Sequence, residues 1–150
     1  MKDFKFAKEC SEKGIEFKGC KEFKVELCLT KEIRDVNCFW IEAYENKENI
    51  NVYPNPSEED LSKRLPKVIK NDILNKEQIE KENWKFHNVP FFCLEVKVQL
   101  SITKIITIRL SYIGESFSSP YNRLIDITGN TTKECYQKAI ILLNDMELLK

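Results

Sequence analysis

Two runs of alternating apolar residues in the second half of the chain constrain its fold more than any other feature. The first run carries apolar side chains at even positions from 92 to 102, and the second does so from 106 to 112. A period of two is typical of a half-buried β-strand, and a single strand of this length would be unusual. We therefore predict a hairpin that turns near residues 101–104. The two apolar sets share a face only if the connection contains an odd number of residues, and a connection of three satisfies this.

Further strands and a first helix are expected around this hairpin. Short apolar runs predict strands at residues 23–29, 36–43, 50–53 and 121–128. Both faces of the 36–43 run are apolar, which predicts a central strand. Phe6 and Cys10 stand at helical spacing, and Gly14 could end a short helix within residues 1–21.

Residues 57–85 predict a helical and strongly charged excursion from the sheet. Ser57 is a candidate N-cap followed by acidic residues, Pro66 interrupts the helix, and Asn75 with Gln78 forms a second capping box. The excursion could be a lid or a partner surface. It could equally be a plain connection that covers one sheet face.

The chain ends in an amphipathic helix. Thr131 and Glu134 form a capping box directly before an apolar run of helical period. The expected inner face consists of Cys135, Ala139, Leu142, Leu143, Met146 and Leu149. Together these elements predict an α+β fold in a single domain of residues 1–150. Its core would be a mainly antiparallel sheet of about six strands, with the C-terminal helix packed on one face.

The start of this helix resembles a segment of known proteins. The pattern Gly129-x-Thr131-x-x-Glu134-Cys135-x-x-x-Ala139 is similar to the ending of many small bacterial and phage proteins, including HicB-like antitoxins. Cys135 replaces the usual alanine, and the similarity covers fewer than twenty residues. What the resemblance implies is a strand, a turn and a capped helix, with no activity attached.

Charge and cysteine content argue against several classes of protein. The 24 basic residues balance 24 acidic ones, whereas nucleic-acid binders usually carry a basic excess, so nucleic acid is not the expected partner and a nucleic-acid-binding module is only the third hypothesis. The six cysteines form no C-x-x-C pair, and the chain has one histidine, so we expect free thiols and no metal site. The charged N-terminus lacks the apolar core of a signal peptide, and no run could span a bilayer. We therefore expect a cytoplasmic protein that does not act at a membrane.

No catalytic or cofactor motif is present, and four glycines are few for a phosphate-binding loop, so we expect no cofactor. An enzyme of unrecognised family stays open as an alternative, with a site near the 57–85 excursion. Its candidate groups would be a His87–Cys93 pair or carboxylates. The candidate carboxylates are Glu42, Glu45, Glu95 and Asp126.

The polar face of the predicted hairpin is the candidate for binding a partner, although such faces are often simply solvated. Glu95, Lys97 and Arg109 lie on this face, and Phe91 flanks it. Phe117, in a serine-rich loop, is a further candidate anchor. The leading hypothesis is a small non-enzymatic protein that binds another protein. An inhibitor, antitoxin or immunity-type protein of a phage or other mobile element would fit the size, the neutrality and the lack of catalytic motifs.

Overall fold

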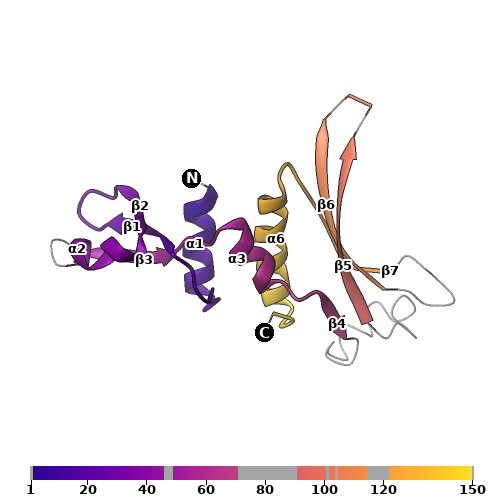
Figure 1. Ribbon diagram of the computed structural model, residues 1–150, viewed down its shortest axis with the longest axis horizontal. Coiled ribbons are helices and arrows are strands. Elements are labelled where there is room, and N and C mark those ends of the chain that lie inside the picture. Colours follow the sequence, from indigo (N-terminus) through magenta and orange to yellow (C-terminus); the bar gives the residue numbers. More distant parts are fainter. Residues whose placement is uncertain are drawn as a thin grey trace. The chain divides into compact units, whose positions relative to one another are not determined.

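The computed structural model describes residues 2–45, 49–70, 91–100, 102–103, 105–114 and 122–149 (Figure 1). Contacts within the chain divide it into two compact units, Met1–Arg64 and Leu65–Lys150. Helices are combined with antiparallel sheets, so the expected α+β class is confirmed. The strands are divided between two sheets instead of forming one, and the single-domain expectation stays a prediction.

The first unit contains a three-stranded antiparallel sheet in the order β2-β1-β3. Its elements are α1 (Lys2–Glu12), β1 (Glu22–Leu27), β2 (Ile33–Asn37), η1 (Cys38–Trp40), α2 (Ile41–Glu45), β3 (Ile50–Pro54) and α3 (Glu58–Arg64). Val25, Leu27 and Val36 form a buried cluster on the sheet. The short helix expected near the N-terminus is confirmed, and it buries Phe6 and Cys10 as the helical spacing predicts.

The prediction of a strand at residues 36–43 is wrong beyond Asn37, where β2 ends and two short helices follow. The Asn37 side chain accepts a hydrogen bond from the Phe39 N–H at 3.1 Å and caps the short helix η1. A side chain that binds the backbone two residues ahead offers the chain an alternative to sheet pairing. As a result, Phe39 and Trp40 are exposed instead of lying in a central strand.

The segment predicted as a helical excursion, residues 57–85, begins with the expected helix but does not continue as one. Ser57 caps α3 through its Oγ, which accepts from the Asp60 N–H at 3.2 Å, and the Asp60 carboxylate accepts from the Ser57 N–H at 3.0 Å. The helix ends at Arg64, and Pro66 prevents its continuation. Val68–Lys70 then forms strand β4, which the sequence analysis missed. The capping box at Asn75 and Gln78 lies outside the described residues.

The second unit contains a four-stranded antiparallel sheet in the order β4-β5-β6-β7. Strands β5 (Phe91–Leu100), β6 (Ile106–Gly114) and β7 (Asn122–Gly129) are followed by helix α6 (Thr132–Asp145). The predicted hairpin is confirmed, with Val96 opposite Leu110 and Leu100 opposite Ile106. Even residues therefore pair with even residues. The connection at 101–105 is odd in number, as the shared face requires, although it is longer than three residues.

Helix α6 packs on β6 and β7 over the even face of this sheet. Its predicted capping box is present, because Thr131 Oγ1 accepts from the Glu134 N–H and the Glu134 carboxylate accepts from the Asn130 N–H, both at 3.1 Å. The first turn lies so close to the end of β7 that a Cβ on Gly129 would stand 3.0 Å from Cys135 Sγ. This close approach gives a physical reason for the glycine in the motif.

The buried face of α6 differs from the predicted one by a small rotation about the helix axis. Cys135, Ala139, Ile140 and Leu143 are buried, whereas Leu142 is 39% exposed. The buried set follows the i, i+4 row from Cys135 to Leu143 with Ile140 beside it, which leaves Leu142 at the border of the contact. The expectation that Leu142 belongs to the core is therefore wrong.

This rotation predicts unequal effects of two neighbouring leucine substitutions. Leu143→Ala should lower the free energy of unfolding by about 2–5 kcal/mol, because it removes a fully buried side chain from a packed core. Leu142→Ala should cost less than about 1 kcal/mol, since that side chain is already partly solvated. Urea denaturation of the two variants measures both values. A larger loss for Leu142→Ala would show that the helix packs through the other face.

Candidate functional site

The even face of the β5–β6 hairpin is covered at its base and uncovered towards its tip. At the base, Ile108 and Leu110 are buried under α6, and the Cys135 thiol donates a hydrogen bond to the Ile108 carbonyl oxygen at 3.4 Å. On β5 the exposed fraction rises from 37% at Val96, opposite Leu110, to 66% at Val98, opposite Ile108, and to 75% at Leu100, nearer the tip. The helix therefore protects only part of one continuous apolar face.

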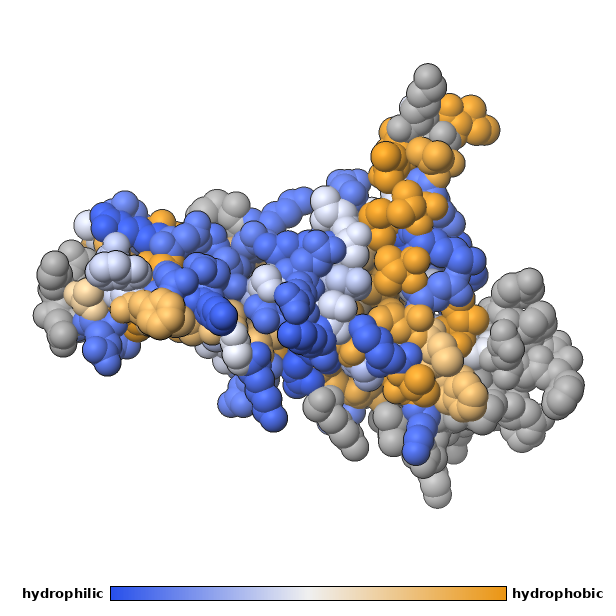
Figure 2. Space-filling view, in the orientation of Figure 1, coloured by the Kyte–Doolittle hydropathy of each residue, from blue (hydrophilic) through white to orange (hydrophobic). Residues whose placement is uncertain are grey.

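We call the uncovered part the apolar strip. It consists of the exposed even residues Val96, Val98, Leu100, Ile102 and Ile106. Figure 2 shows hydrophobic surface along one side of the hairpin up to its tip and hydrophilic surface on the other side. The strip presents on the order of 300 Å² of aliphatic surface, whose complete burial would contribute roughly 5–10 kcal/mol before opposing costs. Contiguous apolar patches of a few hundred Å² often mark binding sites.

The neighbouring strands accompany only the inner part of the hairpin. The Leu94 N–H donates to the Lys67 carbonyl oxygen at 3.0 Å, and the paired residues of β4 reach only from Phe91 to Cys93. On the other side, β7 ends at Gly129 opposite Ile108. Within the described part of the chain, no third strand accompanies the outer half of the hairpin. That half is a two-stranded ribbon, which is marginally stable in water without further packing.

The polar face of the same hairpin is the one that the sequence analysis singled out. The structure brings Glu95, Lys97 and Arg109 together there, with Lys97 directly opposite Arg109 in the register. Lys97 Nζ lies 2.6 Å from a Glu95 carboxylate oxygen. Arg109 forms two hydrogen bonds to Asp126 of β7, at 2.7 and 2.5 Å. Lys97 and Arg109 are therefore each matched by a carboxylate of the same sheet.

The Arg109–Asp126 pair sets the electrostatics of this face. The hydrogen bonds from Arg109 lower the pKa of the Asp126 carboxyl below its ordinary value, and Ser111 Oγ adds a further one at 3.0 Å. The same contact raises the pKa of Arg109. Both groups stay charged at neutral pH, and the pair ties β6 to β7 on the side away from α6.

The other residues proposed for partner binding are placed as follows. Phe91 begins β5 and is 49% exposed, whereas Phe117 lies outside the described residues. Partner binding through the polar face therefore stays a prediction. Sequence reasoning missed the exposure of the apolar strip, although one signal was present. The Gly129-Asn130 turn ends the strand that follows the hairpin, β7, so this strand can accompany only part of the hairpin.

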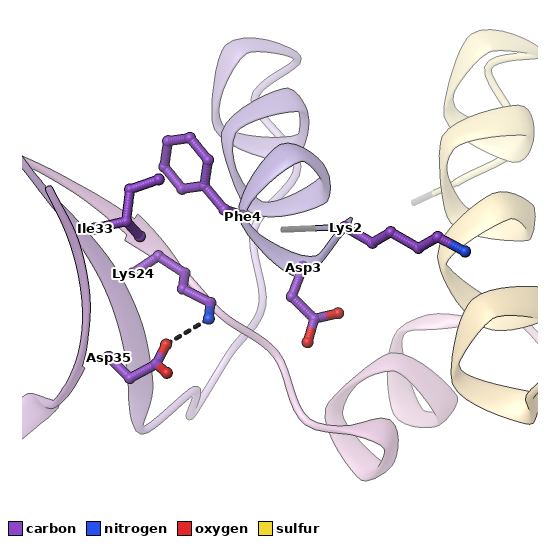
Figure 3. A pocket seen from close by; sticks show the side chains of 6 residues that line it. All are labelled: Lys2, Asp3, Phe4, Lys24, Ile33 and Asp35. Carbon is purple, nitrogen blue, oxygen red and sulfur yellow. Dashed lines mark ion pairs between the residues drawn. The ribbon is translucent and has the colours of Figure 1, made fainter. Parts of the chain in front are cut away.

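Described residues of the first unit line at least two open hollows. The one in Figure 3, of about 380 Å³, is lined by α1 residues and by β1 and β2 residues, with Phe4 beside Ile33 and an ion pair between Lys24 Nζ and Asp35 Oδ1 at 2.5 Å. The second, of about 420 Å³, is lined by residues that include Ser11, Phe17 and Pro54. Neither lining contains a histidine or a cysteine.

Among the residues that the structure describes, the candidate catalytic groups do not lie together in one site. Cys93 is exposed on β5, and His87 lies outside the described ranges. Glu95 and Asp126 are engaged with Lys97 and Arg109, while Glu42 and Glu45 are exposed on α2 in the first unit.

All six cysteines are free thiols, as expected. Burial raises the pKa of the Cys10 thiol to about 12, which makes it a poor nucleophile. The described ranges contain no cluster of three or more residues suited to holding a metal ion. In the same ranges, no helix has the length and apolar character needed to cross a membrane.

Comparisons with known proteins provide no relative from which a function could be transferred. No protein family, no curated protein and no solved structure matches this chain. The functional argument therefore depends on the surface of the molecule itself.

The ion pair on the polar face predicts a pH-dependent effect on stability. Because the pKa of Asp126 is lower in the folded state, its contribution is present above the ordinary pKa of about 3.8 and is lost as the pH falls through the lowered value. Asp126→Asn should therefore lower the melting temperature by a few degrees at pH 7, and this loss should become smaller as the pH falls through the lowered pKa of Asp126. Thermal denaturation across this range measures the difference.

Glu95→Gln provides the matched control, because the Glu95–Lys97 pair is exposed to solvent and should contribute little. An Asp126→Asn variant that is as stable as the unmodified protein at pH 7 would contradict a stabilising role for the pair.

Proposed function

We propose that this protein is a non-enzymatic binding protein that recognises another protein through the apolar strip of its β5–β6 hairpin. The observation that carries the proposal is the rise in exposure along a single apolar face, from buried Leu110 to the exposed Val98 and Leu100. A chain that needed this hairpin only as a scaffold would gain solubility from polar residues at its outer half. Aliphatic residues continue there instead.

The geometry of the hairpin suits docking onto a protein surface. Both strands present side chains on one side, so the apolar strip is wide enough for a helix or a sheet to pack against it. The opposite face carries paired charges at Glu95, Lys97 and Arg109, and these can remain hydrated when the strip is covered.

The kind of binding protein follows from the partner. An inhibitor, an antitoxin and an immunity-type protein all act by occupying a surface of another protein, and none of them needs a catalytic group of its own. The proposal therefore includes these three and prefers none. The enzyme alternative has less support, because the described candidate groups Cys93, Glu95 and Asp126 are not gathered in a pocket that could hold a substrate. The exposed pair Phe39 and Trp40 in the first unit offers a second but smaller surface.

Photocrosslinking in living host cells tests the proposal. A photoreactive phenylalanine analogue at position 98 would lie within the apolar strip, and the same analogue at position 99 would point from the opposite face of the same strand. We expect a covalent adduct with a protein from position 98 and at least about tenfold less from position 99, since crosslinking requires direct contact. Equal yields, or no protein adduct from position 98, would contradict the proposal.

A further inference from the structure

We propose that the outer edge of β2, in the first unit, binds an extended peptide that carries a basic residue and, two positions later, an apolar one. The peptide lies antiparallel to β2 and adds a further strand to the three-stranded sheet. In this mode of recognition, main-chain hydrogen bonds hold the peptide and alternate side chains select it. The site does not use the apolar strip, so the inference goes beyond the proposed function.

The backbone of β2 directs one set of hydrogen-bonding groups away from the sheet. β2 is an edge strand, because the strand order is β2-β1-β3. The Leu27 N–H donates to the Glu32 carbonyl oxygen at 2.9 Å. Bonding alternates along an antiparallel pair, so the even residues of β2 bond to β1 and the odd residues face outward. Among the described residues, no strand pairs with the outward groups of Ile33, Asp35 and Asn37.

The hollow shown in Figure 3 lies beside this edge. Its lining combines Ile33 and Asp35 of β2 with residues from the first turn of α1. Lys24 stands directly opposite Asp35, so the odd residues of β2 share its face of the sheet. On the same face, Phe4 of α1 contacts Tyr53 of β3, with ring centres 5.8 Å apart. A strand added to β2 would therefore place alternate side chains next to a hollow that a helix borders.

The charge beside the edge favours a basic residue opposite Asp35. The Asp35 side chain is 70% exposed, whereas that of its partner Lys24 is 16% exposed. Lys24 Nζ lies 2.5 Å from one oxygen of this carboxylate, which has lone pairs for further donors. Lys2 points away from the ion pair in Figure 3, and Asp3 adds a second carboxylate to the lining. Directly opposite charges on neighbouring strands stabilise their pairing.

The position opposite Ile33 favours an apolar residue. The Ile33 side chain is half-buried and lies beside the ring of Phe4. In an antiparallel peptide, the residue opposite Ile33 follows the residue opposite Asp35 by two positions. Both side chains then lie on the face that carries the hollow. The selected pattern is therefore basic, any residue, apolar.

The same carboxylate disfavours a second copy of this chain on the edge. A twofold pairing of β2 with itself, centred on Asp35, would align Ile33 with Asn37 and place two Asp35 carboxylates directly opposite each other. Like charges in that position destabilise the pairing of strands, and charged side chains commonly protect an edge from its own kind. A peptide with a basic residue meets no such repulsion.

A titration of the full chain, labelled with nitrogen-15, tests the inference by NMR. The probe is a pentapeptide with blocked ends and the sequence TRTLT, which can align arginine with Asp35 and leucine with Ile33. We expect saturable shifts with a dissociation constant below about 1 mM. The amide protons of Ile33 and Asp35 should exchange at least about tenfold more slowly in the complex, because they gain hydrogen bonds. The amides of Arg34 and Val36 already bond to β1 and should change less.

A modified peptide tests the hydrogen bonding without altering the protein. N-methylation of the leucine removes an N–H that faces β2 and should weaken binding at least about fivefold. N-methylation of the central threonine removes an N–H that faces solvent, so this matched control should weaken binding by less than about twofold. Equal losses would overturn strand addition.

Asp35→Asn tests the selection by charge. It should weaken TRTLT about three- to fivefold and change the binding of the neutral peptide TQTLT by less than about twofold. Binding of TQTLT also verifies that the edge of the variant is intact. Equal losses for both peptides would overturn the role of the carboxylate.

Three further outcomes would overturn the site itself. These are an absence of saturable shifts at about 5 mM peptide, which is fivefold above the expected constant, shifts confined to residues outside β2, and amide shifts in β2 that grow with protein concentration before any peptide is added. The last of these would show a second copy on the edge. None of them affects the apolar strip, which photocrosslinking from position 98 tests separately.

Discussion

The packing of the first turns of α6 against β6 and β7 is the contact on which the second unit depends. Gly129 has no side chain, and this lets Cys135 lie against the strand end, where its thiol donates to the Ile108 carbonyl oxygen. Small residues at Cys135 and Ala139 keep the helix close to the sheet. A helix held this close covers a face on which Ile108 and Leu110 of β6 and Ile125 and Ile127 of β7 are buried. It also ends the core at Ile108.

That end point divides a single hairpin into two parts with different roles. Leu110 and Val96 lie directly opposite each other, yet one is fully buried and the other is at the border of solvent. The inner half of β5 and β6 belongs to a core that stabilises the fold. The outer half repeats the same alternation with nothing from the described residues to cover it. The same alternation thus continues the apolar face of the core into the exposed outer half.

The sequence predicted most of the strands and helices, but not which of their residues are buried by neighbouring elements. The alternation at 92–112 predicted the hairpin and its shared face, and the capping box at Thr131 predicted the start of α6. Both signals are local, so they do not depend on distant residues. The strand beyond Asn37 was wrong because one side chain capped the backbone, and Leu142 was misplaced because a small rotation of a helix changes its inner face. The Gly129-Asn130 turn indicates that β7 accompanies only part of the hairpin, but the extent of the apolar strip could not be predicted, because a pattern shows which residues share a face and not how far a neighbouring helix reaches.

The central claim is that Ile108 marks the border between core and binding surface, and a comparison of two unfolding free energies tests it most directly. Val98→Ala and Leu110→Ala remove aliphatic groups from the same face of the same hairpin. Urea denaturation should be done at dilutions where unfolding no longer depends on protein concentration. Leu110→Ala should then cost about 2–5 kcal/mol and Val98→Ala less than about 0.5 kcal/mol. Similar large losses for both variants would show that the outer half is covered within one chain and would contradict the account.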